Sequence, residues 1–390
     1  MLGGPFSPWP AVAQDEKDAV MAVLDSNRVN YWTGQVGREF EREFASAHEV
    51  KHAIAVANGS VALDLAWVAL NLPKGSEVIV TSRTFLASVS SIVLAGLTPV
   101  FADVCADSQN VTADTIAAKI TAKTKAIVCV HLAGWPCDMD AINSLAKQHG
   151  CYVIEDCAQA HGARYKGKPV GGLGDIAAWS FCQDKIMTTG GEGGMVTTNN
   201  TKFWNVMWSY KDHGKSWQAV YEKSHPPGFR WLHESFGTNW RMTEMQSAIG
   251  RCQLQKMPDW IATRTQYAEQ ILNTAKGLKG LRVPEVPEDI QHAYYKCYAF
   301  VEPKQLRKGW DRDRIMQAVV DAGVPCFSGS CSEVYLEKAF ETSGLRPEQP
   351  SPVAHELGET SLMFLVHPTL TQAEIDKTCK VLIAVMEQAV

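Results

Sequence analysis

Residues 151–194 read CYVIEDCAQAHGARYKGKPVGGLGDIAAWSFCQDKIMTTGGEGG. An apolar run at residues 151–154 stops at two acids, Glu155 and Asp156, which is typical of a buried parallel strand. Acids at the carboxyl end of such a strand lie where open α/β sheets hold their ligands. The stretch therefore predicts a ligand crevice at this edge of a parallel sheet.

A second apolar run, residues 176–181, is followed within four residues by Lys185 and then by a glycine-rich segment at 190–194. An acid that ends one strand and a lysine just past the next are suited to pyridoxal phosphate. The lysine can hold the cofactor aldehyde as a Schiff base, while the carboxylate keeps the pyridine nitrogen protonated. A surface lysine and a capping aspartate would give the same spacing, so the spacing alone leaves both interpretations open.

The same stretch carries a longer pattern, which resembles the DegT/DnrJ/EryC1/StrS family of sugar aminotransferases over nearly the whole chain. The resemblance implies an α/β structure of the pyridoxal-phosphate-dependent transferase fold type I. In that fold a mostly parallel central sheet has helices on both faces and is joined to a smaller C-terminal α+β domain. The residues that carry the resemblance are Glu155-Asp156-Cys-Ala-Gln159-Ala-His161-Gly162, Gly167-Lys168, Gly174-Asp175, Ser180-Phe181, Lys185 and Gly190 to Gly194.

The resemblance also implies an activity and its partners. Family members transfer an amino group, in most cases from glutamate, to nucleotide-linked keto-sugars that enter surface polysaccharides or glycosylated metabolites. They use pyridoxal phosphate and its amine form, and they are homodimers with shared active sites. Two alternatives are a nucleotide-sugar 3-dehydratase, in which histidine replaces the lysine, and a non-catalytic regulatory homologue. Lys185 argues against the first, and the intact set of site residues argues against the second.

Individual site residues follow from the family pattern. Lys185 is the expected Schiff-base residue, and Asp156 is expected to contact the pyridine nitrogen. Gly59 and Ser60 open a predicted helix, where free backbone N–H groups suit a phosphate. The resemblance assigns four more cofactor contacts: Phe85 stacked on the ring, Gln159 at the ring or its phenolic oxygen, Ser180 at the phosphate, and Asn239 reaching the cofactor phosphate of the other subunit.

Five further residues are candidate substrate contacts, namely Tyr31, Trp32, His131, His213 and Arg241. Core packing is the alternative for the first two, and a structural histidine with satisfied hydrogen bonds is the alternative for His131. Arg230 and Arg241 are both candidates for binding the donor carboxylate. The sequence does not indicate which sugar, which nucleotide or which carbon is aminated.

Composition excludes several other classes of function. The chain has 390 residues with a formal net charge of −5, and its basic residues are dispersed, so we expect neither nucleic acid nor a membrane surface as a partner. The start, MLGGPFSPWPAV, lacks the features of a signal peptide. Eleven scattered cysteines without a Cys-x-x-Cys pair indicate free thiols in the cytoplasm and no metal site.

Strands alternate with helices as far as residue 200, which predicts a largely parallel sheet. The glycines at 172–174 fit a loose dinucleotide fingerprint, but they precede a strand instead of following one, so we reject that site. The tryptophan-rich residues 202–241 are expected to form a long loop or hairpin, and Pro258 is expected to interrupt a helix. We expect a large cofactor-binding domain at residues 1–255 and a small domain at 256–390.

Overall fold

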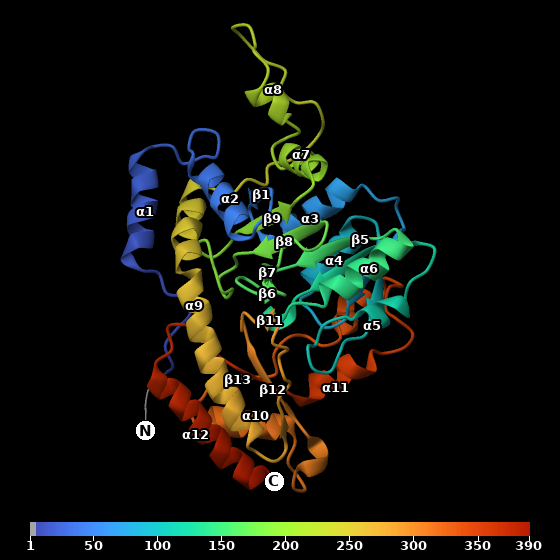
Figure 1. The fold of residues 1–390 in the computed structure, drawn as a ribbon, viewed down its shortest axis with the longest axis vertical. Coiled ribbons are helices and arrows are strands. Elements are labelled where there is room, and N and C mark those ends of the chain that lie inside the picture. Colours follow the sequence, from blue (N-terminus) through green and yellow to red (C-terminus); the bar gives the residue numbers. More distant parts are fainter. Residues whose placement is uncertain (1–4) are drawn as a thin grey trace.

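The computed structural model describes residues 5–390. Its central sheet has seven strands, of which β9 runs antiparallel to both neighbours and the others are parallel to one another (Figure 1). The predicted, mostly parallel sheet is therefore confirmed. In spatial order the strands are β1 (His52–Val56), β9 (Gly194–Thr198), β8 (Ile176–Ser180), β5 (Tyr152–Asp156), β4 (Thr124–Val130), β2 (Glu77–Thr81) and β3 (Thr98–Ala102).

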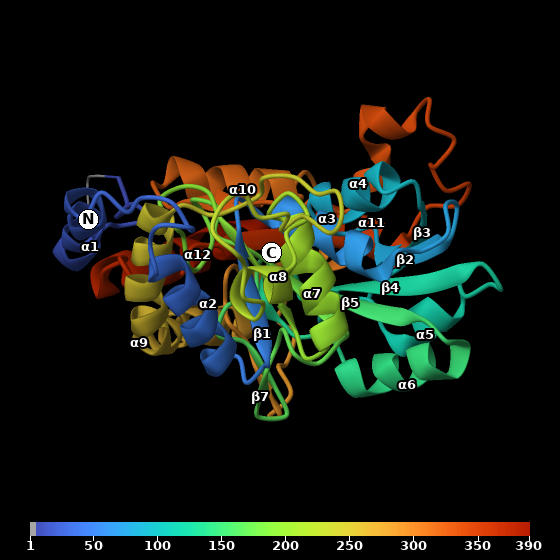
Figure 2. The same cartoon turned by 90° about the horizontal axis from the view of Figure 1, so that it is seen from above.

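Helices cover both faces of this sheet, because alternate side chains of each strand point to opposite layers. Val78 and Val80 of β2 pack in one apolar cluster with α3 and α4, whereas Ile79 packs in another with α5 and α6. Figure 2 shows these two helical layers on either side of the strands. The helices of the large sheet are α2 (Val36–Ala47), α3 (Gly59–Leu70), α4 (Ala87–Leu94), α5 (Ala113–Ala117), α6 (Met139–His149) and α7 (Thr201–Tyr210).

A second, antiparallel sheet lies in the C-terminal part of the chain. Its order is β10 (Leu281–Arg282), β12 (Cys297–Val301), β14 (Ser361–Phe364) and β13 (Cys326–Phe327). Around it lie α10 (Arg312–Asp321), α11 (Pro352–Thr360) and α12 (Gln372–Ala389). A small third sheet joins β11 (Ile290–Gln291), β6 (Arg164–Tyr165) and β7 (Lys168–Pro169).

One long helix, α9 (Glu244–Lys276), runs beside elements of both large sheets. Its N-terminus has the predicted capping box between Thr243 and Gln246. The predicted interruption at Pro258 is wrong, because the helix continues through the proline. Packing of α9 against α1 (Gln14–Asp25), α2 and α12 outweighs the one backbone hydrogen bond that a proline removes. The division at residue 255 stays a prediction, and it would fall inside this helix.

The segment after β9 also differs from the prediction. Instead of an irregular loop, residues 201–221 contain α7 and the short helix α8 (Trp217–Tyr221). Asn200 caps α7 by accepting from the N–H groups of its first turn, and three tryptophans pack with the main core. Beyond α8 the chain is irregular and protrudes from the body (Figure 1). Across the described residues 5–390, no helix combines the length and apolar character that a membrane span requires.

Candidate active site

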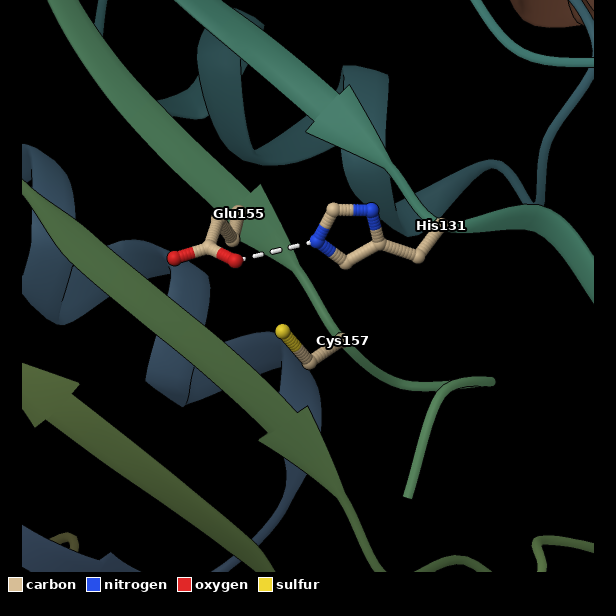
Figure 3. A group of neighbouring side chains, drawn as sticks. All are labelled: His131, Glu155 and Cys157. Atoms are coloured by element: carbon tan, nitrogen blue, oxygen red, sulfur yellow. Dashed lines mark hydrogen bonds and ion pairs between the residues drawn. The ribbon is translucent and has the colours of Figure 1, made fainter. Parts of the chain in front are cut away.

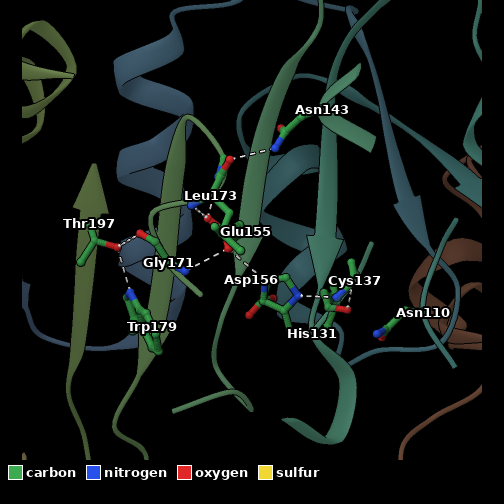
Figure 4. A network of polar contacts seen from close by, with 12 residues as sticks. Asn110, His131, Cys137, Asn143, Glu155, Asp156, Gly171, Leu173, Trp179 and Thr197 are labelled. Carbon is green, nitrogen blue, oxygen red and sulfur yellow. Dashed lines mark hydrogen bonds and ion pairs between the residues drawn. The ribbon is translucent and has the colours of Figure 1, made fainter. Parts of the chain in front are cut away.

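A buried carboxylate at the end of β5 organises the loops around the predicted site. Glu155 is fully buried, and it accepts hydrogen bonds from the backbone N–H groups of Gly171 at 2.9 Å, Leu173 at 2.8 Å and Gly174 at 2.7 Å. His131, at the end of β4, donates to the same carboxylate at 3.0 Å (Figure 4). Burial by itself raises the pKa of Glu155, but His131 and the backbone donors outweigh burial and leave it below the usual value.

His131 is held on both sides of its ring. Its Nδ1 accepts the backbone N–H of Cys137 at 3.0 Å, so the ring proton lies on Nε2 and points to Glu155. The side chain is fully buried. The structure thus places His131 as a structural histidine, the alternative to a substrate contact.

The thiol of Cys157 lies beside this pair, and ligand atoms of the three residues lie within 4.8 Å of one another (Figure 3). A metal ion would have to displace the proton on His131 and the backbone donors on Glu155. Burial also raises the pKa of Cys157 well above its usual value, so its thiol stays protonated. The hydrogen bonds already made explain the cluster, and we assign no metal to it.

Asp156 follows Glu155 in β5 and points to the opposite face of the sheet. One carboxylate oxygen accepts from the hydroxyl of Ser88 in α4 at 2.7 Å, and the other accepts from the backbone N–H of Ala158 at 3.1 Å. The side chain is 6% exposed. These contacts fix its orientation at the carboxyl edge of the sheet, where the sequence predicts the ligand crevice.

The predicted phosphate contacts come together from two elements. A Cβ added to Gly59 would lie only 2.6 Å from Cβ of Ser180, so the first turn of α3 packs directly on the end of β8. Asn58 caps α3 by accepting from the N–H of Val61 at 3.0 Å. Ser60, the second residue of this helix, is exposed. Hydroxyl groups beside a helix N-terminus form a cradle that suits a phosphate.

Lys185 lies just beyond β8 with its side chain 16% exposed. Its Nζ is 3.5 Å from Asp184 and 3.4 Å from the hydroxyl of Tyr295, and its backbone carbonyl accepts from the indole N–H of Trp9 at 2.9 Å. Burial raises the pKa of Asp184, but the charge of Lys185 and the hydroxyl of Tyr295 lower it by more. The pKa of Asp184 is therefore below its usual value. The amine of Lys185 therefore has two defined polar partners, Asp184 and Tyr295, at the sheet edge.

Two further predicted residues present groups at this edge. Gln159 is 7% exposed, and its side-chain oxygen accepts from the backbone N–H of Ala133 at 2.8 Å. Phe85 is 70% exposed, although it is a large apolar side chain in the turn that leads into α4. Phe85 precedes Ser88, the partner of Asp156, by three residues, and its exposed aromatic face suits a flat, charged ring. The cradle, Asp156, Lys185 and Phe85 together fit the donor and surface requirements of pyridoxal phosphate.

The remaining candidates are spread more widely. Tyr31 is 2% exposed and its hydroxyl bonds to Glu41 and Trp208, so it lies in the core, as the alternative for this residue expected. Trp32 is partly buried against the same core. His213 and Asn239 are exposed, and the side chain of Arg241 is 14% exposed beside Asp212. The structure of one chain therefore assigns none of these five residues to a cofactor or substrate contact.

Comparison with known proteins decides the family. The sequence pattern of the DegT/DnrJ/EryC1/StrS aminotransferase family matches residues 10–383. The chain belongs to this family. The resemblance predicted from residues 151–194 is therefore confirmed.

Individual relatives agree with this assignment over nearly their whole length. GDP-perosamine synthase of Escherichia coli O157:H7 is 34% identical over 95% of each chain. A dTDP-3-amino-3,4,6-trideoxy-alpha-D-glucose transaminase of Streptomyces venezuelae is 32% identical over 96% of this chain and 92% of the relative. The crystal structure of an aminotransferase from Psychrobacter cryohalolentis is 62% identical and superimposes with a TM-score of 0.96, covering 98% of this chain and 99% of that one.

Sequence reasoning missed three residues that contact the predicted site residues Lys185 and Asp156. Trp9 lies in the N-terminal segment and Tyr295 is 110 residues from Lys185, so neither belongs to a short motif. Ser88 follows Phe85 by three residues, and a search for hydroxyl groups one helical turn past the predicted stacking residue would have found it. Contacts between distant segments require the fold.

We expect Glu155→Gln to destabilise this aminotransferase by about 3 kcal/mol, because an amide cannot accept from all four donors and turns its own N–H groups toward backbone N–H groups. The pKa of Glu155 is lowered in the folded state. Its contribution to folding stability is therefore fully present above its ordinary pKa, and it is lost as the pH falls through its pKa in the folded protein. Thermal unfolding of the wild type and of Glu155→Gln, measured from neutral to acidic pH, should show that their difference in stability becomes smaller below about pH 4.3. Exposed Glu192→Gln serves as the control and should change little. A difference in stability that stays constant down to acidic pH would contradict this account.

We expect Asp156→Asn to reduce turnover by roughly 10²- to 10³-fold, the scale of losing one preorganised charge in a site. The asparagine oxygen can still accept from Ala158, and its amide N–H can donate to the Ser88 hydroxyl, which can turn its own proton to Thr84, so the melting temperature should change little. Asp175→Asn is the matched control, since Asp175 accepts from Val153 at the other end of β5 and should leave turnover unchanged. Near-normal turnover in Asp156→Asn would show that another group keeps the cofactor ring protonated.

Proposed function

We propose that this chain is a pyridoxal-phosphate-dependent aminotransferase that transfers the amino group of glutamate to a nucleotide-diphospho keto-sugar. The single observation that carries the proposal is the placement of Asp156 and Lys185 at the same edge of the sheet, at the ends of the adjacent parallel strands β5 and β8. The names of the relatives support a nucleotide-linked sugar as substrate. A cytoplasmic location is what the free cysteines of the sequence predict.

Each residue of the site has one task in this reaction. Pyridoxal phosphate, when bound, supplies an aldehyde for amines and a ring that accepts electrons from the reacting carbon. Gly59, Ser60 and Ser180 would hold its phosphate, and Asp156 would hold a proton on its ring nitrogen. The Nζ of Lys185 would anchor the cofactor. As a free amine, the same Nζ would take a proton from the amino donor and later return one to the sugar.

Two half-reactions share these residues, so the donor and the keto-sugar must use one site in turn. Sugar dehydratases of the family have a histidine in place of the Schiff-base lysine. This chain has lysine at that position, Lys185. The reaction is therefore assigned to amination.

We expect the purified protein to be yellow, to lose its colour with glutamate, and to aminate at least one keto-sugar in a panel linked to GDP, dTDP or UDP. Mass spectrometry of the product detects the exchange of oxygen for an amino group. The GDP-linked sugars come first, because GDP-perosamine synthases are among the relatives. Lys185→Ala should fold and aminate none of them.

Borohydride reduction and peptide mapping give the control for this assignment. The adduct should lie on Lys185, not on exposed Lys168 or buried Lys211. A colourless protein, or an adduct on either of the other two lysines, would contradict the proposed site.

A homodimer with shared active sites is the second part of the proposal. Asn239 is exposed and forms an antiparallel bridge with Asp212, at the point where the segment after α8 returns to the end of α7. This segment leaves large aromatic side chains in solvent, with Phe229 78%, Trp231 84% and Phe236 99% exposed. Apolar side chains gathered on one protruding segment favour a protein interface. The tryptophans at 204, 208 and 217, by contrast, pack with the core of their own chain.

Mixing two inactive variants tests whether the sites are shared. If Asn239 serves the other subunit, a dimer of Lys185→Ala and Asn239→Ala chains has one site with both residues intact and should recover partial activity. If Asn239 serves its own chain, both sites carry a defect and activity stays absent. Native mass spectrometry confirms that subunits have exchanged. No recovery in an exchanged mixture would remove the shared-site proposal.

A further inference from the structure

We propose that Tyr295 is a positioning residue for the catalytic lysine: its hydroxyl holds the amine of Lys185 and is itself held by Asp184. This inference rests on the proposed function, because it concerns the amine that anchors the cofactor and moves the proton.

The hydroxyl of Tyr295 lies between two partners. It accepts from the Nζ of Lys185 at 3.4 Å and donates to the carboxylate of Asp184. The Nζ also lies 5.0 Å from the centre of the Tyr295 ring and 3.5 Å from Asp184. One phenol therefore connects the amine to the adjacent residue of its own loop. The amine keeps a defined position even when it is not bound to a ligand.

The backbone around Tyr295 is fixed against the large sheet. Ala293 donates to the carbonyl of Gly134 at 2.9 Å, and a Cβ on Gly134 would come within 2.9 Å of Ala293 Cβ. Arg264 of α9 donates to the carbonyl of Tyr294 at 3.3 Å. The neighbouring Ala133 donates to Gln159, a predicted cofactor contact. The phenol is thus placed by the same loop that orders the cofactor side of the site.

The protonation state of Tyr295 suits a holding role. The side chain is 8% exposed, and burial together with the charge of Asp184 raises its pKa well above the usual value, although Arg264 opposes this. The phenol therefore keeps its proton and donates it to Asp184, which leaves its oxygen free to accept from the lysine. Proton transfer at carbon remains the task of Lys185, and Tyr295 limits where its amine can move.

Labelling of the cofactor-free protein tests this contact without any sugar. An acetylating reagent is added at fixed pH, and peptide mass spectrometry gives the initial rate at Lys185 relative to exposed Lys168. We expect at least a threefold faster rate in Tyr295→Phe, because the amine is no longer held. The control is Tyr294→Phe, which removes a hydroxyl from the adjacent residue and should leave the ratio unchanged.

Kinetics of the same variants supply the second measurement. Tyr295→Phe should lower kcat about five- to tenfold with little change in the KM for glutamate, the scale of losing one hydrogen bond to a reacting group. Its melting temperature and the yield of the borohydride adduct should match the wild type. A variant that loses stability and kcat together, with an unchanged labelling ratio, would show a structural role only.

Asp184→Asn is the second variant, chosen because its side chain is 62% exposed and the change should not affect folding. It weakens the anchor of the phenol and should raise the Lys185 labelling rate. Equal Lys185 rates in wild type and either variant would overturn the inference. A wild-type protein that aminates none of the panel sugars would instead count against the proposed function, since the labelling requires neither cofactor nor substrate.

Discussion

The carboxylate of Glu155 has no access to solvent, and the cost of burying its charge is met by four hydrogen bonds. Those bonds come from the end of β4 and from three backbone N–H groups in the turn before β8 (Figure 4). Because successive side chains of a strand point to opposite faces, holding Glu155 on one face of β5 turns Asp156 toward the other. There Asp156 meets Ser88 of α4. The orientation of Asp156, the proposed partner of the cofactor ring nitrogen, thus depends on a neighbouring acid whose own hydrogen bonds are all made within the protein.

The same sheet edge determines how the other groups reach the site. Strand β8 lies between β5 and β9, and its end carries Ser180 against Gly59 and, a few residues later, Lys185. Glycine at 194 lets β9 approach the start of α3, since a Cβ there would lie 2.4 Å from the carbonyl oxygen of Asn58. The lysine is then contacted from outside the sheet by Trp9 and Tyr295. Strands β5 and β8 and the start of α3 thus provide Asp156 and the Gly59–Ser180 cradle. Segments distant in sequence, those of Trp9 and Tyr295, contact Lys185.

The parts of the site that are local in sequence were predictable. Apolar runs ending in acids marked β5, and the glycine and serine after β1 marked the start of α3, because both signals depend on neighbouring residues only. Pro258 misled the prediction because tertiary packing of α9 exceeds the local cost of a proline. The poorly periodic sequence at 201–210 did not indicate α7, whose tryptophans Trp204 and Trp208 pack in the main apolar cluster. Tyr295 could not be predicted, since its position depends on hydrogen bonds that its neighbours Ala293 and Tyr294 make with Gly134 and Arg264, which no local pattern encodes.

The central claim is that Asp156, Lys185 and the Gly59–Ser180 cradle form one cofactor site on a frame held by Glu155. A crystal structure of the protein grown with pyridoxal phosphate tests it most directly. The account predicts continuous electron density from the Nζ of Lys185 to the cofactor, with the ring nitrogen at Asp156 and the phosphate at Gly59, Ser60 and Ser180. Density at another lysine, or a cofactor whose ring nitrogen faces away from Asp156, would contradict it.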